Sequence, residues 1–170
     1  MKVPIPVGVK LSAKQSPKTQ EEEEDMSFVP YASAVDSLMH AMVCTRPDIA
    51  HAVGVLSRFI SKLGKGHWKI VKQVFRYLCG TSDYGLCYQG RLGLDKVLDI
   101  HGFVDADWAG DLDQRRYTSG YVFNLFGGVV IWMTKKQSIV ALSTTKAEYM
   151  AATHARKEVV WLQRLCSSMG

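Results

Sequence analysis

The chain has 170 residues, of which 47% are hydrophobic, and a net charge of +5 at pH 7. This length suffices for one full core or two small ones. The longest apolar run, residues 128–133, is far shorter than the roughly 20 residues that a membrane-spanning helix needs. The N-terminus lacks the sustained apolar stretch and cleavage site of a secretory signal. We therefore expect no membrane partner and an intracellular protein, cytoplasmic or nuclear, with an organellar location not excluded.

Residues 1–25 differ in composition from the rest of the chain. They mix prolines, lysines and an acidic run, residues 21–25, with little periodicity, which is typical of a linker or an extended strap that is poorly ordered alone. Because the acidic run lies here, the remainder of the chain is more basic than the average, and a basic body favours a polyanionic partner. No cysteine pair has zinc-site spacing, so we expect buried, reduced thiols at Cys44, Cys79, Cys87 and Cys166.

Three helices are predicted in the first half from apolar residues at helical spacing. The first spans residues 31–45, with Ser33 available as its N-cap. The second spans 47–63 and ends at Gly64, where glycine suits a left-handed stop. The third spans 67–78. Together they predict a small three-helix unit.

The second half has the alternation and turn residues of strands, followed by one long helix. Gly127-Gly128 is a plausible tight turn between two of these strands. The helix carries an apolar stripe, which must be buried, and we expect it to pack against the sheet. The predicted strands are 85–89, 97–105, 121–126 and 129–134, and the helix runs from about residue 143 to the end of the chain.

Two aspartates lie at the end of the predicted strand 97–105. Asp105 and Asp107 are two positions apart, so both carboxylates point to one face if the strand continues. Such oxygen clusters bind divalent cations, and a two-metal nuclease needs several of them. The alternative is that these acids and Asp111 simply solvate a turn and pair with Arg115 and Arg116.

Glu148 also has a functional and a structural interpretation. It lies near the start of the long helix, where Thr145-x-x-Glu148 fits a capping box. Without other context, capping is the favoured role. Lys146 stands in the same turn, where a cation opposes the helix dipole.

A stripe of basic residues runs along the third predicted helix, with Trp68 and Tyr77 nearby. Such a stripe binds a phosphate backbone, although a solvated helix face is the commoner explanation. The candidate nucleic-acid-binding residues are Lys65, Lys69, Lys72 and Arg76.

Taken together, these segments resemble the reverse transcriptase and RNase H region of Ty1/copia-type retrotransposon polyproteins. Single motifs are weak, but seven in the family's order, covering nearly the whole chain, are specific. The segments that carry the resemblance are residues 31–39, 44–53, 75–81, 105–111, 118–121, 140–145 and 147–151.

The resemblance implies an α/β (α+β) chain. Residues 26–90 correspond to the helical thumb or connection of reverse transcriptase, and residues 91–170 to a truncated RNase H-like domain. This truncated domain consists of the first three strands, in an antiparallel sheet, and a long helix. By this resemblance, Asp105 and Glu148 match the family's catalytic, magnesium-binding acids. Asp107 matches a family position whose role as a metal ligand is less secure. We expect the carboxylates of Asp105 and Glu148 to face each other across the strand–helix contact.

Several family features are missing or changed. No polymerase Tyr-x-Asp-Asp motif occurs, and the family's third and fourth catalytic acids have no counterpart before Gly170. Asp36 replaces a usual glycine, and Lys146 replaces a usual glutamate, which puts a positive charge beside the metal site. We therefore expect a catalytically incomplete RNase H fragment of a polyprotein, whose partners are an RNA:DNA hybrid or other nucleic acid and the remainder of the polyprotein. The alternative is a non-catalytic nucleic-acid binder or a non-functional relic.

Overall fold

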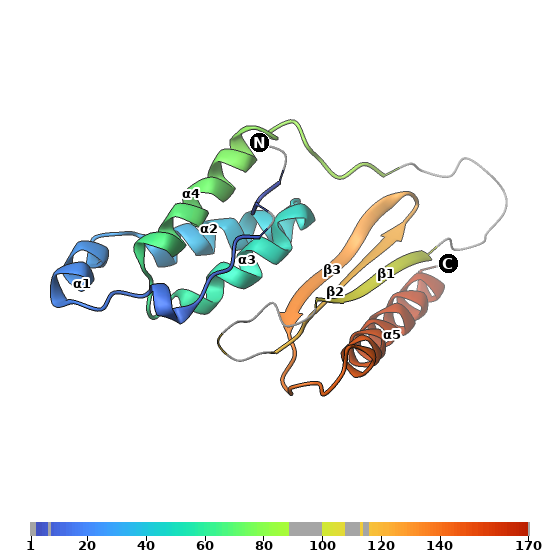
Figure 1. Cartoon of the computed structure of the whole chain (residues 1–170). Helices are drawn as coiled ribbons and strands as arrows, with labels where there is room; N and C mark the ends of the chain where they lie inside the picture. Colours follow the sequence, from blue (N-terminus) through green and yellow to red (C-terminus); the bar gives the residue numbers. More distant parts are fainter. Residues whose placement is uncertain (1–2, 7, 89–99, 108–112, 114–115, 170) are drawn as a thin grey trace. The chain divides into compact units, whose positions relative to one another are not determined.

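The chain divides into a helical unit, up to Gly85 and including Asp113, and a sheet unit from Leu86 onward (Figure 1). The domain boundary predicted between residues 90 and 91 falls outside the described part. Each unit is described by itself. The computed structural model describes residues 3–6, 8–88, 100–107, 113 and 116–169.

The helical unit is built from short and long helices that follow one another closely. Its acidic run, predicted to lie in a linker or an extended strap, forms a helix of its own, α1, with the hydroxyl of Thr19 as N-cap. In chain order the elements are η1 (Ala13–Gln15), α1 (Gln20–Ser27), α2 (Tyr31–Cys44), η2 (Pro47–Ile49), α3 (Ala50–Leu56), η3 (Ser57–Phe59) and α4 (Lys65–Cys79).

One apolar core holds α2, α3 and α4 together. Tyr31, only 1% exposed, donates a hydrogen bond from its hydroxyl to the Leu56 carbonyl oxygen at 2.9 Å, and burial raises its pKa. This bond joins the start of α2 to the end of α3. The remaining fully buried side chains of this core include Val35, Leu38, Ile49, Val53, Val71 and Val74.

Three details of the predicted helices are wrong. Helix α2 begins at Tyr31 after Pro30, so Ser33 is not its N-cap. The second predicted helix is broken into η2, α3 and η3. Gly64 has φ −128°, and it is the N-cap of α4 rather than a left-handed stop. Its missing side chain matters because a Cβ there would strike the Gln15 carbonyl.

The N-terminal segment is fastened to this unit through His67. Its Nδ1 accepts from the Gly64 N–H at 2.9 Å, so the proton sits on Nε2, which lies 3.2 Å from the Ser12 carbonyl oxygen. Burial lowers the pKa of His67, and its ring stacks on Phe59 with centroids 4.1 Å apart. Ser12 in turn donates to the Asp113 carboxylate at 2.7 Å. Ser12, in the segment predicted to be a linker or an extended strap, is thus held against α4.

The sheet unit is a three-stranded antiparallel sheet in the order β1–β2–β3. Residues 85–88, part of the predicted strand 85–89, are not a strand, and residue 89 lies outside the description. The prediction of a small antiparallel sheet followed by a long helix is confirmed. The bounds are β1 (Ile100–Asp107), β2 (Thr118–Leu125), β3 (Gly128–Lys136) and α5 (Thr144–Ser168).

The turn between β2 and β3 differs from the predicted one. Phe126 and Gly127 have φ values of 52° and 79°, and positive φ at both central residues defines the turn type that matches the twist of a hairpin. The turn is therefore Phe126-Gly127, one residue earlier than predicted, and Gly128 already belongs to β3.

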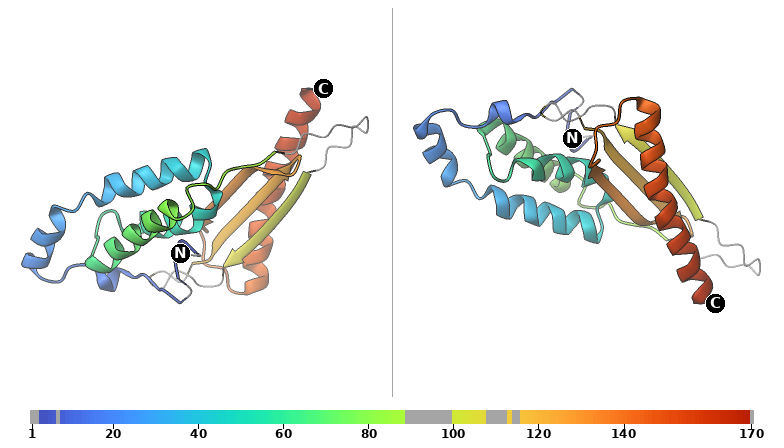
Figure 2. Two further views of the ribbon diagram at one scale, coloured as in Figure 1. Left: turned by 90° about the horizontal axis from the view of Figure 1, so that it is seen from above. Right: turned by 90° about the horizontal axis from the view of Figure 1, so that it is seen from below.

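Helix α5 covers one face of the sheet, as both views in Figure 2 show. Tyr121 and Phe123 of β2 are buried against Leu162 and Cys166 of α5. Cys166 is the buried cysteine expected from the sequence, whereas Cys44, Cys79 and Cys87 are exposed, so that expectation was wrong for those three. None of the described helices is both long and apolar enough to cross a membrane.

Candidate functional site

Asp105 lies near the end of β1 and is exposed. It pairs with Gly120 of β2, while its neighbour Ala106 pairs with Ser119. Ala106 is buried in a cluster with Ala147 and Ala151 of α5. Because successive side chains of a strand point to opposite faces, Asp105 projects from the face that α5 does not cover. Asp107 ends the same strand and its side chain, like Asp111, lies outside the description.

Glu148 lies in the second turn of α5 and is exposed. The N-cap is Ser143, whose hydroxyl accepts from the Lys146 N–H at 3.2 Å. Thr145 is therefore inside the helix, and the capping box that it would form with Glu148 does not exist. The structural interpretation of Glu148 as a capping residue is wrong, which leaves its carboxylate available for binding.

The contact between β1 and α5 runs through the immediate neighbours of the two acids. Ala106 and Ala147 are 8% and 0% exposed, and such small side chains let the helix approach the strand closely. The carboxylates of Asp105 and Glu148 flank this contact but do not face each other across it, contrary to our expectation. Sequence alone places both acids next to the contact; which face each occupies depends on the strand register.

Gln137, which the sequence analysis did not single out, links the three elements around this contact. It follows β3, is 6% exposed, and donates from its Nε2 to the Ser119 hydroxyl and to the Ala147 carbonyl oxygen, both at 2.9 Å. Its backbone N–H donates to the Tyr117 carbonyl oxygen at 2.8 Å. A single glutamine after two lysines carries no recognisable signal, so only the fold reveals this role.

The described residues do not form a preorganised metal centre. Among them, no group of three or more histidine, cysteine, aspartate or glutamate side chains is close enough to hold an ion. Magnesium favours octahedral oxygen coordination with one or two carboxylates and several waters. Asp105 and Glu148 supply the right oxygen chemistry. Lys146, expected beside the metal site, is two residues before Glu148 in α5 and therefore projects from another side of the helix.

The basic stripe of the sequence analysis lies on the exposed face of α4. Its four residues, spaced at helical intervals, are all exposed, and the opposite face is buried in the core. Lys65 forms an ion pair with Asp25 at 3.0 Å, but both side chains are about two-thirds exposed, so this pair is weak. Trp68 and Tyr77 pack with the core and do not extend the stripe. The stripe consists of Lys65, Lys69, Lys72 and Arg76.

Comparison with known proteins gives a consistent set of relatives. The chain is 53% identical over 98% of its length to the retrovirus-related Pol polyprotein from transposon TNT 1-94 of Nicotiana tabacum, of which it spans 12%. It is 34% identical, over 98% of its length, to the Pol polyprotein from transposon RE2 of Arabidopsis thaliana, of which it spans 11%. It is 54% identical over 81% of its length to secreted RxLR effector protein 161 of Plasmopara viticola, 94% of which it covers. No protein-family model and no solved structure matches.

Proposed function

The chain belongs to the family of retrovirus-related Pol polyproteins of copia-type transposons, and from this premise we propose that it contributes RNase H-type structure to such a polyprotein. In this proposal the sheet unit is the RNase H-like part and the helical unit is the connection that precedes it. The chain spans about one eighth of the transposon polyproteins that it matches, so the rest of the polyprotein is its proposed partner. The proposed substrate class is an RNA:DNA hybrid.

One observation carries the RNase H proposal. Asp105 on β1 and Glu148 on α5 are exposed acids on either side of a tight alanine contact. Burial of the neighbouring alanines fixes the positions of both acids, and neither acid has a capping or core role. The family resemblance implies acids on a first strand and a following helix, and both elements carry theirs here, although the two carboxylates do not face each other across the contact.

Magnesium is the proposed cofactor of the complete nuclease. Asp105 and Glu148, with Asp107 as a further candidate, are the residues that would hold it, and two such ions activate water and stabilise the leaving oxygen. The described donors do not form a group of three, so we derive no cleavage step through a metal. We propose instead that this chain binds nucleic acid without efficient cleavage.

The basic stripe on α4 supports nucleic-acid binding. Exposed lysine and arginine side chains attract phosphates and release bound counterions, so affinity falls steeply with salt. Because Trp68 and Tyr77 face the core, base stacking by these residues does not contribute. The stripe is therefore proposed to contact the backbone and to bind with little sequence preference.

A labelled hybrid tests both parts of this proposal. We expect the full chain to retain the hybrid at low salt, to release it as salt rises, and to cleave it negligibly with magnesium. Lys69→Gln with Lys72→Gln should weaken retention and reduce the salt slope by about 2, whereas Lys14→Gln, an exposed lysine outside the stripe, should not.

Two results would contradict the proposal. Robust magnesium-dependent cleavage that Asp105→Asn abolishes would show that the chain is an active nuclease. Failure to bind hybrid, duplex or single strands at low salt would favour a relic with no nucleic-acid partner.

A further inference from the structure

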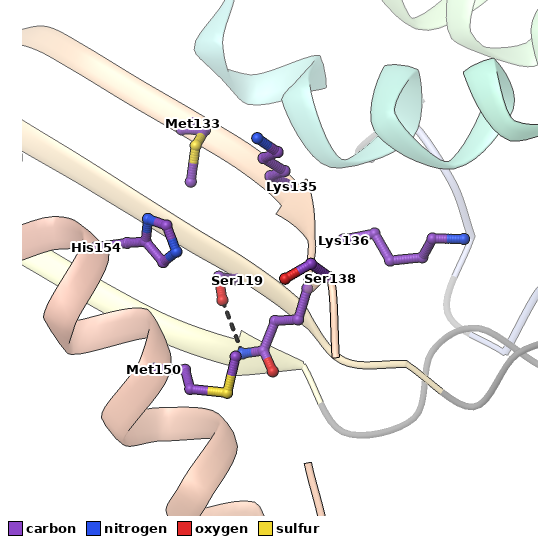
Figure 3. Close-up of a pocket in the computed structure, with 8 residues that line it drawn as sticks. Ser119, Met133, Lys135, Lys136, Ser138, Met150 and His154 are labelled. Atoms are coloured by element: carbon purple, nitrogen blue, oxygen red, sulfur yellow. Dashed lines mark hydrogen bonds between the residues drawn. The ribbon is translucent and has the colours of Figure 1, made fainter. Parts of the chain in front are cut away.

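The two edge strands of the sheet unit, β1 and β3, differ in how they are protected. An open edge offers backbone N–H and C=O groups to other chains, and proteins usually cover such an edge or place lysines on it. At the start of β3 the Tyr88 ring lies against Gly128, and the Tyr88 hydroxyl donates to the Val129 carbonyl oxygen at 2.9 Å. The other end of β3 carries Lys135 and Lys136 (Figure 3). This edge therefore has both kinds of protection.

The edge at β1 is open by comparison. Among the described strands β1 pairs with β2 alone (Figure 2). Residues 101–105 are all exposed, and Phe103, a large apolar side chain, is 69% exposed. The sequence of β1 contains no lysine, arginine or proline. An edge of this kind, with an exposed aromatic side chain near its middle, favours pairing with a further strand.

The sequence of β1 is complementary to itself in one antiparallel register. His101, Phe103 and Asp105 alternate along the strand and so lie on one face, which is the face that α5 does not cover. When two copies of β1 pair with Phe103 opposite Phe103, His101 of each copy lies opposite Asp105 of the other. An imidazole N–H then donates to a carboxylate on either side of a central aromatic pair. Cross-strand pairs of both kinds stabilise a sheet.

Neighbouring registers lose this match. Twofold pairing keeps the α5 helices of both copies on one face of the joined sheet, so the register must be centred on a single residue. Centred on Val104, it sets Phe103 opposite Asp105, and centred on Gly102 it sets Phe103 opposite His101. The register centred on Phe103 is therefore the favoured one.

We propose that two copies of the chain associate through β1, in the antiparallel register centred on Phe103. The product is a twofold dimer with one continuous sheet, to which each copy contributes three strands. Because α5 contacts β1 and β2 of its own copy, the two α5 helices lie about two strand spacings apart, or about 10 Å, a distance at which helices pack. The contact is small for a protein interface, so the dimer is weak and forms at micromolar concentration or above. It requires no nucleic acid and is independent of the proposed function.

Sedimentation velocity of the full chain over a range of concentrations tests for the dimer. A chelator is present, since Asp105 is also the proposed magnesium ligand, and nucleic acid is absent. We expect a monomer at low and a dimer at high concentration, and Phe103→Lys should abolish the dimer by placing a charge on the edge. Trp161→Lys is the matched control. Trp161 is 55% exposed and lies on the same face of α5 as Met150, next to β3, so its replacement should leave the dimer unchanged.

A charge swap tests the pairing of His101 with Asp105. His101→Asp sets two carboxylates opposite each other, and Asp105→Lys sets an ammonium opposite the imidazole. Each single variant should raise the dimer dissociation constant about tenfold, because the mismatch occurs twice in a twofold interface. The double variant has a carboxylate opposite an ammonium in both places and should recover the affinity of the wild type.

Disulfide formation measures the register directly. In a background where the exposed cysteines 44, 79 and 87 are serine, Phe103→Cys places two Cα atoms directly opposite, about 4.5–5.5 Å apart, which a disulfide can bridge. Val104→Cys places them diagonally, about 7–8 Å apart, which is too far. Copper-catalysed oxidation by air should therefore give a covalent dimer of Phe103→Cys and little of Val104→Cys on a non-reducing gel.

Several outcomes would overturn the dimer. They are a monomer at every concentration, a dimer that Phe103→Lys leaves intact or Trp161→Lys abolishes, and a double charge variant no better than the single ones. Covalent dimers of Val104→Cys in preference to Phe103→Cys would also overturn it. Circular dichroism identifies any variant that fails to fold, and if Phe103→Lys is one of them, the cysteine variants still decide. Hybrid binding is measured separately, so either proposal can fail while the other holds.

Discussion

In the helical unit the buried Arg46, His67 and Thr81 side chains are hydrogen-bonded, whereas in the sheet unit two buried oxygens, on Asn124 and Gln137, have no partner among the described residues. Arg46 is 8% exposed. It donates to both oxygens of Asp48, at 3.0 and 2.7 Å, and to Thr81 at 2.6 Å. A buried polar network whose donors and acceptors are all hydrogen-bonded stabilises one arrangement of the core over others. The two unpaired oxygens show that the described part of the sheet unit lacks a network of this kind.

This contrast explains two motifs that look alike in the sequence. Segment 44–53 and segment 105–111 both contain an aspartate among small and apolar residues. In the first, Asp48 accepts from Arg46 and from the Tyr77 hydroxyl at 2.8 Å, and it joins the start of η2 to α4. In the second, Asp105 is exposed. Of these two motifs that carry the family resemblance, one is therefore structural and the other is a candidate for chemistry.

The largest expected effect comes from breaking the paired network. Asp48→Ala leaves the largely buried Arg46 guanidinium without its carboxylate, whose side chain is 31% exposed, and this costs about 1.5–3 kcal/mol in the free energy of unfolding. Chemical denaturation followed by circular dichroism measures the loss. Lys65→Ala, which removes the exposed pair with Asp25, should cost under about 1 kcal/mol. Similar losses of stability for Asp48→Ala and Lys65→Ala would show that the Arg46–Asp48 pair stabilises the fold no more than an exposed ion pair does.

The same network predicts a dependence on acid. Burial alone raises the pKa of Asp48, but hydrogen bonds from Arg46 and Tyr77 outweigh it, so the folded pKa is lowered. A lowered pKa means that the stabilisation is complete above the unfolded value of about 3.9 and is lost as the pH falls below it. The stability of the wild type should therefore fall more steeply below about pH 4 than that of Asp48→Ala. Parallel curves would contradict this assignment.

The alanine contact of the sheet unit should be sensitive to added volume. Ala151 is 1% exposed and packs with Ala106 and Ala147. Ala151→Leu should push α5 from β1 and cost about 1–3 kcal/mol, measured by thermal unfolding. Ala152→Leu, at an exposed position of the same helix, is the matched control and should be nearly neutral. Equal stability of both variants would show that α5 does not pack tightly on β1.

The sequence predicted the elements better than the contacts between them. Apolar spacing located α2, α4 and α5 because their buried faces are periodic. Gly64 was misassigned because its glycine is needed for the approach of Gln15, a distant residue. Asp105 and Glu148 were placed on the correct elements, but the face of Asp105 depends on register with β2. Gln137 was missed because its partners are separated from it in the sequence.

The start of α5 offers a smaller effect. Ser143→Ala removes the hydroxyl that accepts from the Lys146 N–H, and loss of an N-cap costs about 1 kcal/mol. Thr145→Ala is the control, since Thr145 lies inside the helix and caps nothing. Thermal unfolding should separate the two variants. The reverse order would restore the capping role of Thr145 and, with it, the structural interpretation of Glu148.

The smallest expected effect comes from Lys146, the residue that departs from the family pattern. Lys146→Glu replaces a cation by an anion in the first turn of α5, three residues after the N-cap Ser143. An acid there is favoured by the helix dipole and can complete a capping box with Ser143, a gain of about 0.3–1 kcal/mol. Lys146→Gln separates the two contributions, because glutamine can complete the box without adding charge. Thermal unfolding of the two variants and the wild type measures this gain. Equal stability of Lys146→Glu and the wild type would show that neither the dipole nor a capping box acts at this position.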